Sequence, residues 1–114
     1  MFTLYGISNC DTVKKAQKWL QQQSIDFTFH DFKKQGLSKE LLTELANLGD
    51  WSTLLNKRST TFRQLPDEIK NNLTNDVIFN AVLEQPTLLK RPLLPLNGVL
   101  HLGFKDAQYQ ELFK

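Results

Sequence analysis

The sequence predicts an α/β fold with a mixed four-stranded sheet flanked by helices, and three observations lead to it. Residues 2–32 contain a strand pattern, a helix pattern and a second strand pattern, in that order. The stretch from about 38 to 86 contains helix patterns only. After it, two short apolar segments flank Asn97-Gly98, and a final helix pattern follows. We therefore expect the order β-α-β, helical insertion, β-β-α within a single domain spanning residues 1–114.

The first part of the chain predicts two strands joined by a helix. Residues 2–5, FTLY, are β-branched and aromatic, which predicts a short buried strand ending at Gly6. Apolar residues then recur at helical spacing and predict a helix from about Asp11 to Gln23. Residues 27–32, FTFHDF, alternate as a second strand does. Because a helix joins the two strands, we expect them to be parallel.

The helical insertion is predicted mainly from helix-terminal residues. Ser38 and Thr74 are good N-caps for the helix patterns that follow them. Gly49 is the predicted C-cap of the first pattern, and Pro86 stops the second. Pro66 can open a short helix between them. The pattern after Ser38 also has an apolar stripe that we expect to face the core: Leu41, Leu42, Leu45 and Leu48.

The last third predicts a hairpin and a helix. Residues 92–96, PLLPL, and 99–102, VLHL, flank Asn97-Gly98, the strongest short hairpin signal in a sequence. Residues 106–113 predict a C-terminal helix. Its expected inward residues are Ala107, Leu112 and Phe113. The complete order of elements describes a thioredoxin-like sheet with helices inserted at its centre.

Composition limits the classes of function. The chain has 114 residues, a formal net charge of +2 and one cysteine. This weak charge gives no electrostatic indication of a nucleic-acid partner. One cysteine cannot form an internal disulfide, which suits a reducing compartment. The N-terminus lacks a signal-peptide pattern, and no apolar run is long enough to span a membrane. We expect a cytoplasmic protein, monomeric, that binds neither nucleic acid nor membrane.

Cys10 is the candidate nucleophile, because it lies where the first strand pattern gives way to the first helix pattern. Free N–H groups and the positive end of the helix dipole favour a thiolate there. Asn9, next to it, and Lys14, one turn on, are the candidate thiolate-stabilising residues. Asp11 acts slightly against a thiolate. The alternative is that Cys10 is a small, buried and inert hydrophobic residue.

Two other segments supply candidate anion-binding residues. X-Pro bonds reach the cis form readily, and in thioredoxin-like sheets a cis-proline at the place of Pro92 lies beside the active cysteine. Arg91 would then be within reach of the sulfur or of a bound anion. The alternative for Arg91 is an exposed arginine in a loop. Arg58 and Arg63 fall on a predicted loop, where a solvated basic patch is equally consistent with the sequence.

Four separated segments resemble the ArsC/Spx superfamily, and within it the YffB-like proteins. They are YGISNCDTVKKAQKWL, LLNKRSTTFRQL, LKRPLL and LGFKDAQYQELF, in the family's order and over nearly the whole chain. The resemblance implies a thioredoxin-like domain with a helical insertion. It also implies that Cys10 is the site nucleophile and that Arg91 lines the site beside a cis Pro92. Arg58 resembles the family's third contributor.

The sequence departs from the arsenate reductases of this family in two respects. They carry a histidine in the loop before the cysteine, whereas residues 6–9 here are GISN. They also place three arginines around the sulfur, and only Arg91 aligns cleanly. Arg58 is offset by about two positions, and Phe104 stands where the third arginine is expected. Each lost guanidinium removes charge-assisted hydrogen bonds to an oxyanion, which argues against efficient arsenate reduction.

Spx-type regulators of the superfamily use a C-x-x-C switch and bind RNA polymerase. Here Val13 stands at the second cysteine position, so that switch cannot form. Gly103-Phe104 nonetheless resembles the Spx pattern. A non-catalytic binding protein that contacts RNA polymerase therefore stays open as an alternative.

A lone thiolate can attack a disulfide and then be released by an external thiol. Our main hypothesis is a glutathione-dependent thiol reductase, with glutathione as co-substrate, no bound cofactor, and glutaredoxin as a further partner. The carboxylates of glutathione could pair with Arg58, Arg91 or Lys14. An arsenate reductase that uses glutathione and glutaredoxin is the other enzymatic alternative. His30 and His101 lack the spacing of metal ligands, so we expect no metal site.

Overall fold

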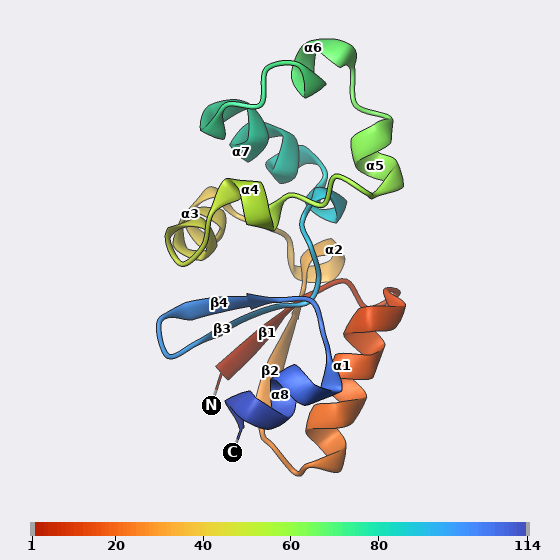
Figure 1. The fold of residues 1–114 in the computed structure, drawn as a ribbon, viewed down its shortest axis with the longest axis vertical. Helices are drawn as coiled ribbons and strands as arrows, with labels where there is room; N and C mark the ends of the chain where they lie inside the picture. The colour runs from red at the N-terminus through yellow and green to blue at the C-terminus, as the bar shows by residue number, and fades with distance from the viewer. Residues whose placement is uncertain (1, 114) are drawn as a thin grey trace. The chain divides into compact units, whose positions relative to one another are not determined.

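The computed structural model describes residues 2–113, which form two compact units. The first unit combines the N-terminal segment up to Gly36 with the segment that starts at Arg91. The second unit is the intervening stretch, Leu37–Lys90. Figure 1 shows the elements of each unit along the chain. Within residues 2–113, no helix is long and apolar enough to cross a membrane.

The first unit contains a mixed four-stranded sheet, as the sequence predicts. The strands are β1 (Phe2–Gly6), β2 (Phe27–Asp31), β3 (Leu93–Leu96) and β4 (Val99–Leu102). They lie in the order β2-β1-β3-β4. The β1–β2 pair is parallel, whereas the β1–β3 and β3–β4 pairs are antiparallel. The two segments of chain that form this unit therefore meet in the middle of its sheet.

Two helices, α1 (Asp11–Gln22) and α8 (Asp106–Leu112), cover one face of this sheet. The shared core consists of Leu4, Ala16, Trp19, Leu20, Leu94 and Tyr109. Leu112 and Phe113 pack against it, as predicted, but Ala107 is exposed and Tyr109 is the buried residue of α8. The correction follows from helix geometry, because Tyr109, Leu112 and Phe113 share the i, i+3, i+4 face.

The predicted hairpin is confirmed at residues 93–102. Asn97 and Gly98 both have positive φ angles, of 54° and 77°, as a two-residue type I′ turn requires. β3 and β4 pair from Leu96–Val99 through to Leu93–Leu102. This turn geometry explains why the local sequence was sufficient to place both strands.

The second strand ends one residue earlier than predicted. β2 stops at Asp31, and Phe32 begins a one-turn helix, α2 (Phe32–Gln35). The Asp31 carboxylate accepts a hydrogen bond from the Lys33 N–H at 2.9 Å and so caps α2. Phe32 is apolar and buried, which suits the end of a strand and the start of a helix alike, so the alternating pattern alone could not distinguish the two.

The second unit is helical. Its elements are α3 (Lys39–Asn47), α4 (Trp51–Leu54), α5 (Thr60–Arg63), α6 (Asp67–Lys70), α7 (Asn75–Glu84) and the 3-10 helix η1 (Pro86–Leu88). The predicted caps are confirmed, because the Ser38 and Thr74 hydroxyls accept hydrogen bonds from the N–H groups of Leu41 and Val77. Pro66 directly precedes α6, also as predicted.

The end of α3 differs from the prediction. Leu42 and Leu45 are buried, but Leu48 is 37% exposed and is itself the C-cap, so it does not belong to the apolar stripe. Gly49 lies one residue beyond the cap and does not have the positive φ of a glycine C-cap. The α5 helix, capped by Ser59 at the Phe62 N–H, was not predicted either.

Candidate active site

Cys10 is the N-cap residue of α1, with φ −91° and ψ 126°. Its N–H donates to the Ile7 carbonyl at 3.1 Å, which closes a turn over residues 7–10 between β1 and α1. Its own carbonyl accepts from the Lys14 N–H at 3.0 Å and begins the helix. The side chain is half-buried, and the sulfur accepts no hydrogen bond from the first turn of α1. The expected position at a helix start is confirmed, and the thiol is not fully buried.

The start of α1 is held close to the end of β1. A Cβ placed on Gly6 would lie 2.8 Å from Cγ2 of Val13, so only glycine fits there without a shift. Val13 itself is fully buried. Val13, which stands where a C-x-x-C motif has its second cysteine, therefore packs into the interior. Because Gly6 has no side chain, the buried Val13 side chain lies close to the end of β1, directly before the turn that carries Cys10.

Pro92 lies beside the end of β1. The peptide bond between Arg91 and Pro92 is cis, as predicted. Tyr5 of β1 pairs with Leu93 of β3 in antiparallel register. The same register, continued by one residue, places Pro92 opposite Gly6. The Pro92 carbonyl accepts from the Gly103 N–H at 2.9 Å. Arg91 is half-buried rather than an exposed loop residue. The start of β3 and the turn that carries Cys10 thus lie at the same end of the two central strands.

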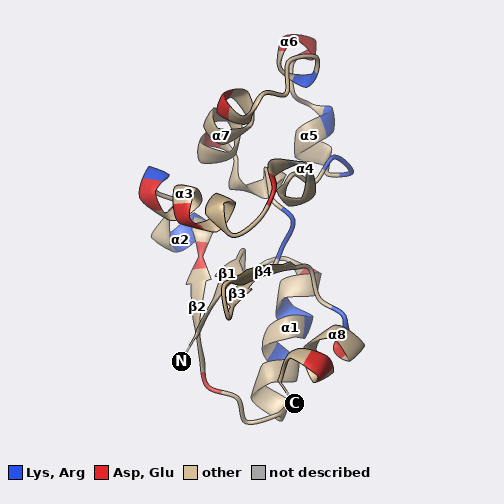
Figure 2. Cartoon of the chain, turned by 60° about the vertical axis from the view of Figure 1, so that its left-hand side comes forward, with Lys and Arg blue, Asp and Glu red and all other residues tan. Residues whose placement is uncertain are grey.

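The lysines of α1 supply positive charge near this edge. Lys14 is exposed one turn beyond Cys10, and Lys15 and Lys18 are exposed further along the helix. Figure 2 shows them as blue bands on α1. Asn9 is exposed in the turn. The structure therefore leaves both predicted thiolate-stabilising side chains accessible from solvent.

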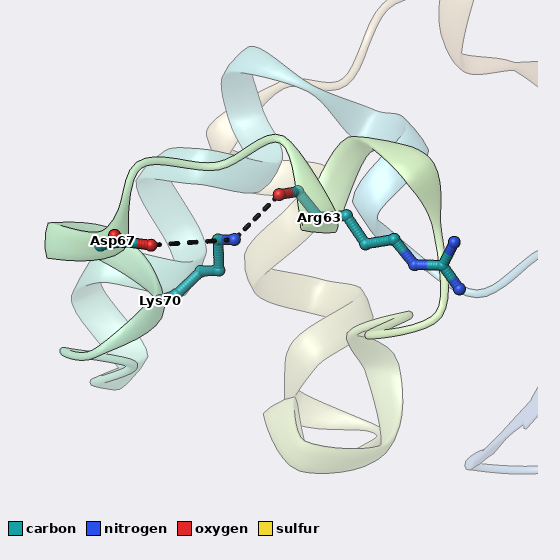
Figure 3. A network of polar contacts seen from close by, with 3 residues as sticks. All are labelled: Arg63, Asp67 and Lys70. Atoms are coloured by element: carbon teal, nitrogen blue, oxygen red, sulfur yellow. Dashed lines mark hydrogen bonds and ion pairs between the residues drawn. The ribbon is translucent and has the colours of Figure 1, made fainter.

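Arg58 belongs to the second unit, so its approach to Cys10 stays a prediction. It is exposed, and its N–H donates to Oδ1 of Asn56 at 3.2 Å. Arg63 lies in α5 rather than in a loop. Its carbonyl accepts from the ammonium of Lys70 at 2.8 Å, and Lys70 lies 4.0 Å from Asp67 (Figure 3). The guanidinium of Arg63 points away from this network (Figure 3).

Sequence reasoning missed Asp31, a buried carboxylate beside the Cys10 turn. Its Oδ2 accepts from the Ser8 N–H at 3.3 Å, and its Oδ1 accepts from the Lys33 N–H. Burial alone would raise the pKa of this carboxyl, but hydrogen bonds from Ser8, Lys33 and Lys34 outweigh it, and the pKa is lowered. The available signal was one acidic residue at the end of an otherwise apolar strand pattern.

The two histidines lie on strands of the sheet. His30 Nε2 lies 2.8 Å from the Gly36 carbonyl oxygen, and its ring contacts Tyr5 at 5.2 Å between centroids. His101 lies on β4. Within the described part of the chain, no three His, Cys, Asp or Glu side chains form a group that could hold a metal ion.

Comparison with known proteins gives a consistent result. The family model described as "ArsC family" matches residues 5–112. An uncharacterized protein from Haemophilus influenzae is 43% identical over 113 residues, which is 99% of each chain. The global transcriptional regulator Spx of Lactiplantibacillus plantarum is 32% identical over 110 residues, covering 95% of this chain and 83% of that protein.

Two solved structures are similar over nearly the whole chain. A YffB protein superimposes with a TM-score of 0.92 at 38% identity and covers 100% of both chains. An arsenate reductase (ArsC) related protein from Brucella melitensis is 47% identical, with a TM-score of 0.79, over 98% of this chain and 93% of that chain. Both similarities extend over the first and the second unit of this chain.

Proposed function

The chain belongs to the ArsC family, and from this premise we propose that it is a glutathione-dependent thiol reductase. The observation that carries the proposal is the position of Cys10, half-buried at the start of α1 and at the sheet edge where the cis Arg91–Pro92 bond lies. Backbone N–H groups at a helix N-terminus favour the thiolate, which is the reactive form of cysteine.

The proposed reaction has two thiol–disulfide exchange steps. The Cys10 thiolate attacks the glutathione sulfur of a mixed disulfide R–S–S–G, forming a Cys10–S–S–G bond and releasing the substrate thiolate, which takes up a proton. A second glutathione thiolate then attacks the glutathione sulfur bound to Cys10. The products are oxidised glutathione and the regenerated Cys10 thiolate. In sum, the mixed disulfide R–S–S–G and one free glutathione give the thiol R–SH and oxidised glutathione, so the substrate sulfur is reduced at the expense of one free glutathione thiol.

The other proposed roles follow from charge and from position near Cys10. Lys14 and Asn9 stabilise the thiolate from the first turn of α1 and from the turn before it. Arg91 and Arg58 bind the carboxylates of glutathione, and Pro92 positions the mixed disulfide beside the thiol. No resolving cysteine is needed, because the second thiol comes from glutathione. Glutaredoxin is a further partner under this proposal.

The test is reduction of a glutathione-peptide mixed disulfide, followed as NADPH consumed through added glutathione reductase. Cys10→Ser should lose the protein-dependent rate entirely, because a hydroxyl does not exchange with disulfides. Gln21→Ala is the control in the same helix; its side chain is exposed and has no part in the proposed site, so it should retain the activity. A Cys10→Ser variant that keeps the parent rate would show that the mechanism is wrong.

Arsenate reduction is the second candidate, because one similar structure is described as arsenate reductase related. It predicts arsenate-dependent oxidation of glutathione, with or without added glutaredoxin, in the same coupled assay. A binding role like that of Spx is the third, supported by the similarity to the regulator from Lactiplantibacillus plantarum. It predicts that the chain captures RNA polymerase equally well with Cys10→Ser as with the parent protein.

A further inference from the structure

Asp31 is a charged side chain in an unusual environment. Asp31 is 4% exposed, and among the described residues no other charged side chain is buried. An isolated carboxylate is costly to bury, so its hydrogen bonds must compensate. Donors from both sides of Asp31 supply them: the N–H and hydroxyl of Ser8, and the N–H groups of Lys33 and Lys34.

Capping of α2 explains only part of this arrangement. A cap for a four-residue helix needs one oxygen, and Oδ1 provides it at the Lys33 N–H. The other oxygen, Oδ2, reaches across 23 residues of sequence to the Ser8 N–H. A neutral, exposed serine or asparagine would cap α2 equally well, as Ser38 does for α3. The contact with Ser8 therefore requires a separate reason.

Ser8 lies inside the turn that carries Cys10. The turn has one backbone hydrogen bond, from the Cys10 N–H to the Ile7 carbonyl. Asp31 pairs with Gly6 in the β1–β2 register, and Gly6 is the residue directly before the turn. The Asp31–Ser8 contact is thus a second point of attachment, which links the turn to the end of β2.

We propose that Asp31 is a positioning residue for Cys10: its carboxylate holds the turn over residues 7–10 and so fixes the place and direction of the thiol. The inference rests on the proposed function only for its effect on catalysis. Thiol exchange needs three sulfurs nearly in line, so a turn that moves freely lowers the fraction of productive encounters. Asp31 itself does not touch the reacting atoms.

The first measurement is amide hydrogen exchange in the parent protein and in Asp31→Ala. The Ser8 and Cys10 amides should exchange at least about tenfold faster in the variant, while the Leu4 amide in β1 serves as an internal reference. Asp31→Asn keeps the side-chain size and one carbonyl acceptor, so it should fold if Asp31→Ala does not and should lose part of the protection. Unchanged protection at Ser8 in either folded variant would overturn the proposal.

The second measurement separates positioning from simple loss of stability. In the mixed-disulfide assay, folded Asp31→Ala should lose about tenfold in kcat with KM within about twofold of the parent, and Asp31→Asn should recover part of the loss. Ser38→Ala removes a similar cap hydrogen bond in the second unit and should leave kcat unchanged. An equal loss in Ser38→Ala would overturn the positioning role. If the parent shows no reductase activity, the proposed function fails, and the exchange measurement still decides this inference.

Discussion

At the scale of single residues, Tyr109 combines complete burial with a polar group. The side chain packs edge-on against Phe104 and Trp19, with ring centroids 4.7 and 5.6 Å away. Among the described residues, no atom accepts or donates a hydrogen bond at its hydroxyl. Burial raises the pKa of the Tyr109 phenol, so the group stays neutral. Its ring stabilises the core, whereas its hydroxyl contributes only a desolvation cost.

We expect Tyr109→Phe to leave stability unchanged or to raise it by up to about 1 kcal/mol, because an unsatisfied buried hydroxyl costs roughly 1–3 kcal/mol. Urea unfolding at neutral pH measures the change. Tyr5→Phe is the control, since Tyr5 is half-buried and its change should stay within about 0.5 kcal/mol. A loss of more than about 1 kcal/mol in Tyr109→Phe would mean that the hydroxyl is satisfied in solution.

At the scale of elements, the packing of β1 against α1 depends on Gly6. Gly6→Ala should destabilise the protein by about 1–3 kcal/mol, because its Cβ would meet the stiff, buried Val13. Val13→Ala removes the obstacle, so the double variant should be at least about 1 kcal/mol more stable than the sum of the single changes predicts. Gly98→Ala is the control; its site is open, with a positive φ of 77°, and its cost should simply add to that of Val13→Ala. Additive energies at Gly6 and Val13 would contradict the contact.

Local signals predicted the elements well where the cause lies within a few residues. Asn97-Gly98 determines its own turn, and Ser38 and Thr74 bond to N–H groups three residues on. The prediction failed where a partner is distant or the element is short. Asp31 finds Ser8 only after the strands pair, and the single turn of α5 lies in a stretch of threonines with no strong helix propensity.

The same distinction applies to the candidate site. The positions of Cys10 and Pro92 could be predicted, because a helix start and an X-Pro bond are visible in the sequence, and the structure has the helix start and the cis bond where expected. The roles of both residues in a reaction stay predictions. The two residues come together at one end of the central strands because β1 pairs with β3, a pairing that was not predicted from the sequence. The buried partner of the turn, Asp31, was invisible because burial depends on packing and not on neighbouring residues.

At the scale of the whole molecule, the first unit is built from two segments that are far apart in the sequence. The later segment supplies β3, which lies inside the sheet, and with it Leu93, Leu94 and Tyr109, all fully buried. The parallel β1–β2 pair cannot bury its apolar face alone. Formation of the site around Cys10 therefore depends on residues that follow the second unit.

We expect a fragment of residues 1–90 to lack a folded sheet, although it contains Cys10, α1 and the complete second unit. The Leu4 amide in β1 should then exchange at the rate of an unfolded chain, and Cys10 should react with iodoacetamide as fast with denaturant as without it. A fragment of residues 1–104 is the control, because it retains all four strands and loses only α8. It should protect the Leu4 amide, more weakly than the full chain, since Tyr109 is missing. Protection of Leu4 in the shorter fragment would show that β1, α1 and β2 fold without β3, and that the Cys10 turn forms before the sheet is complete.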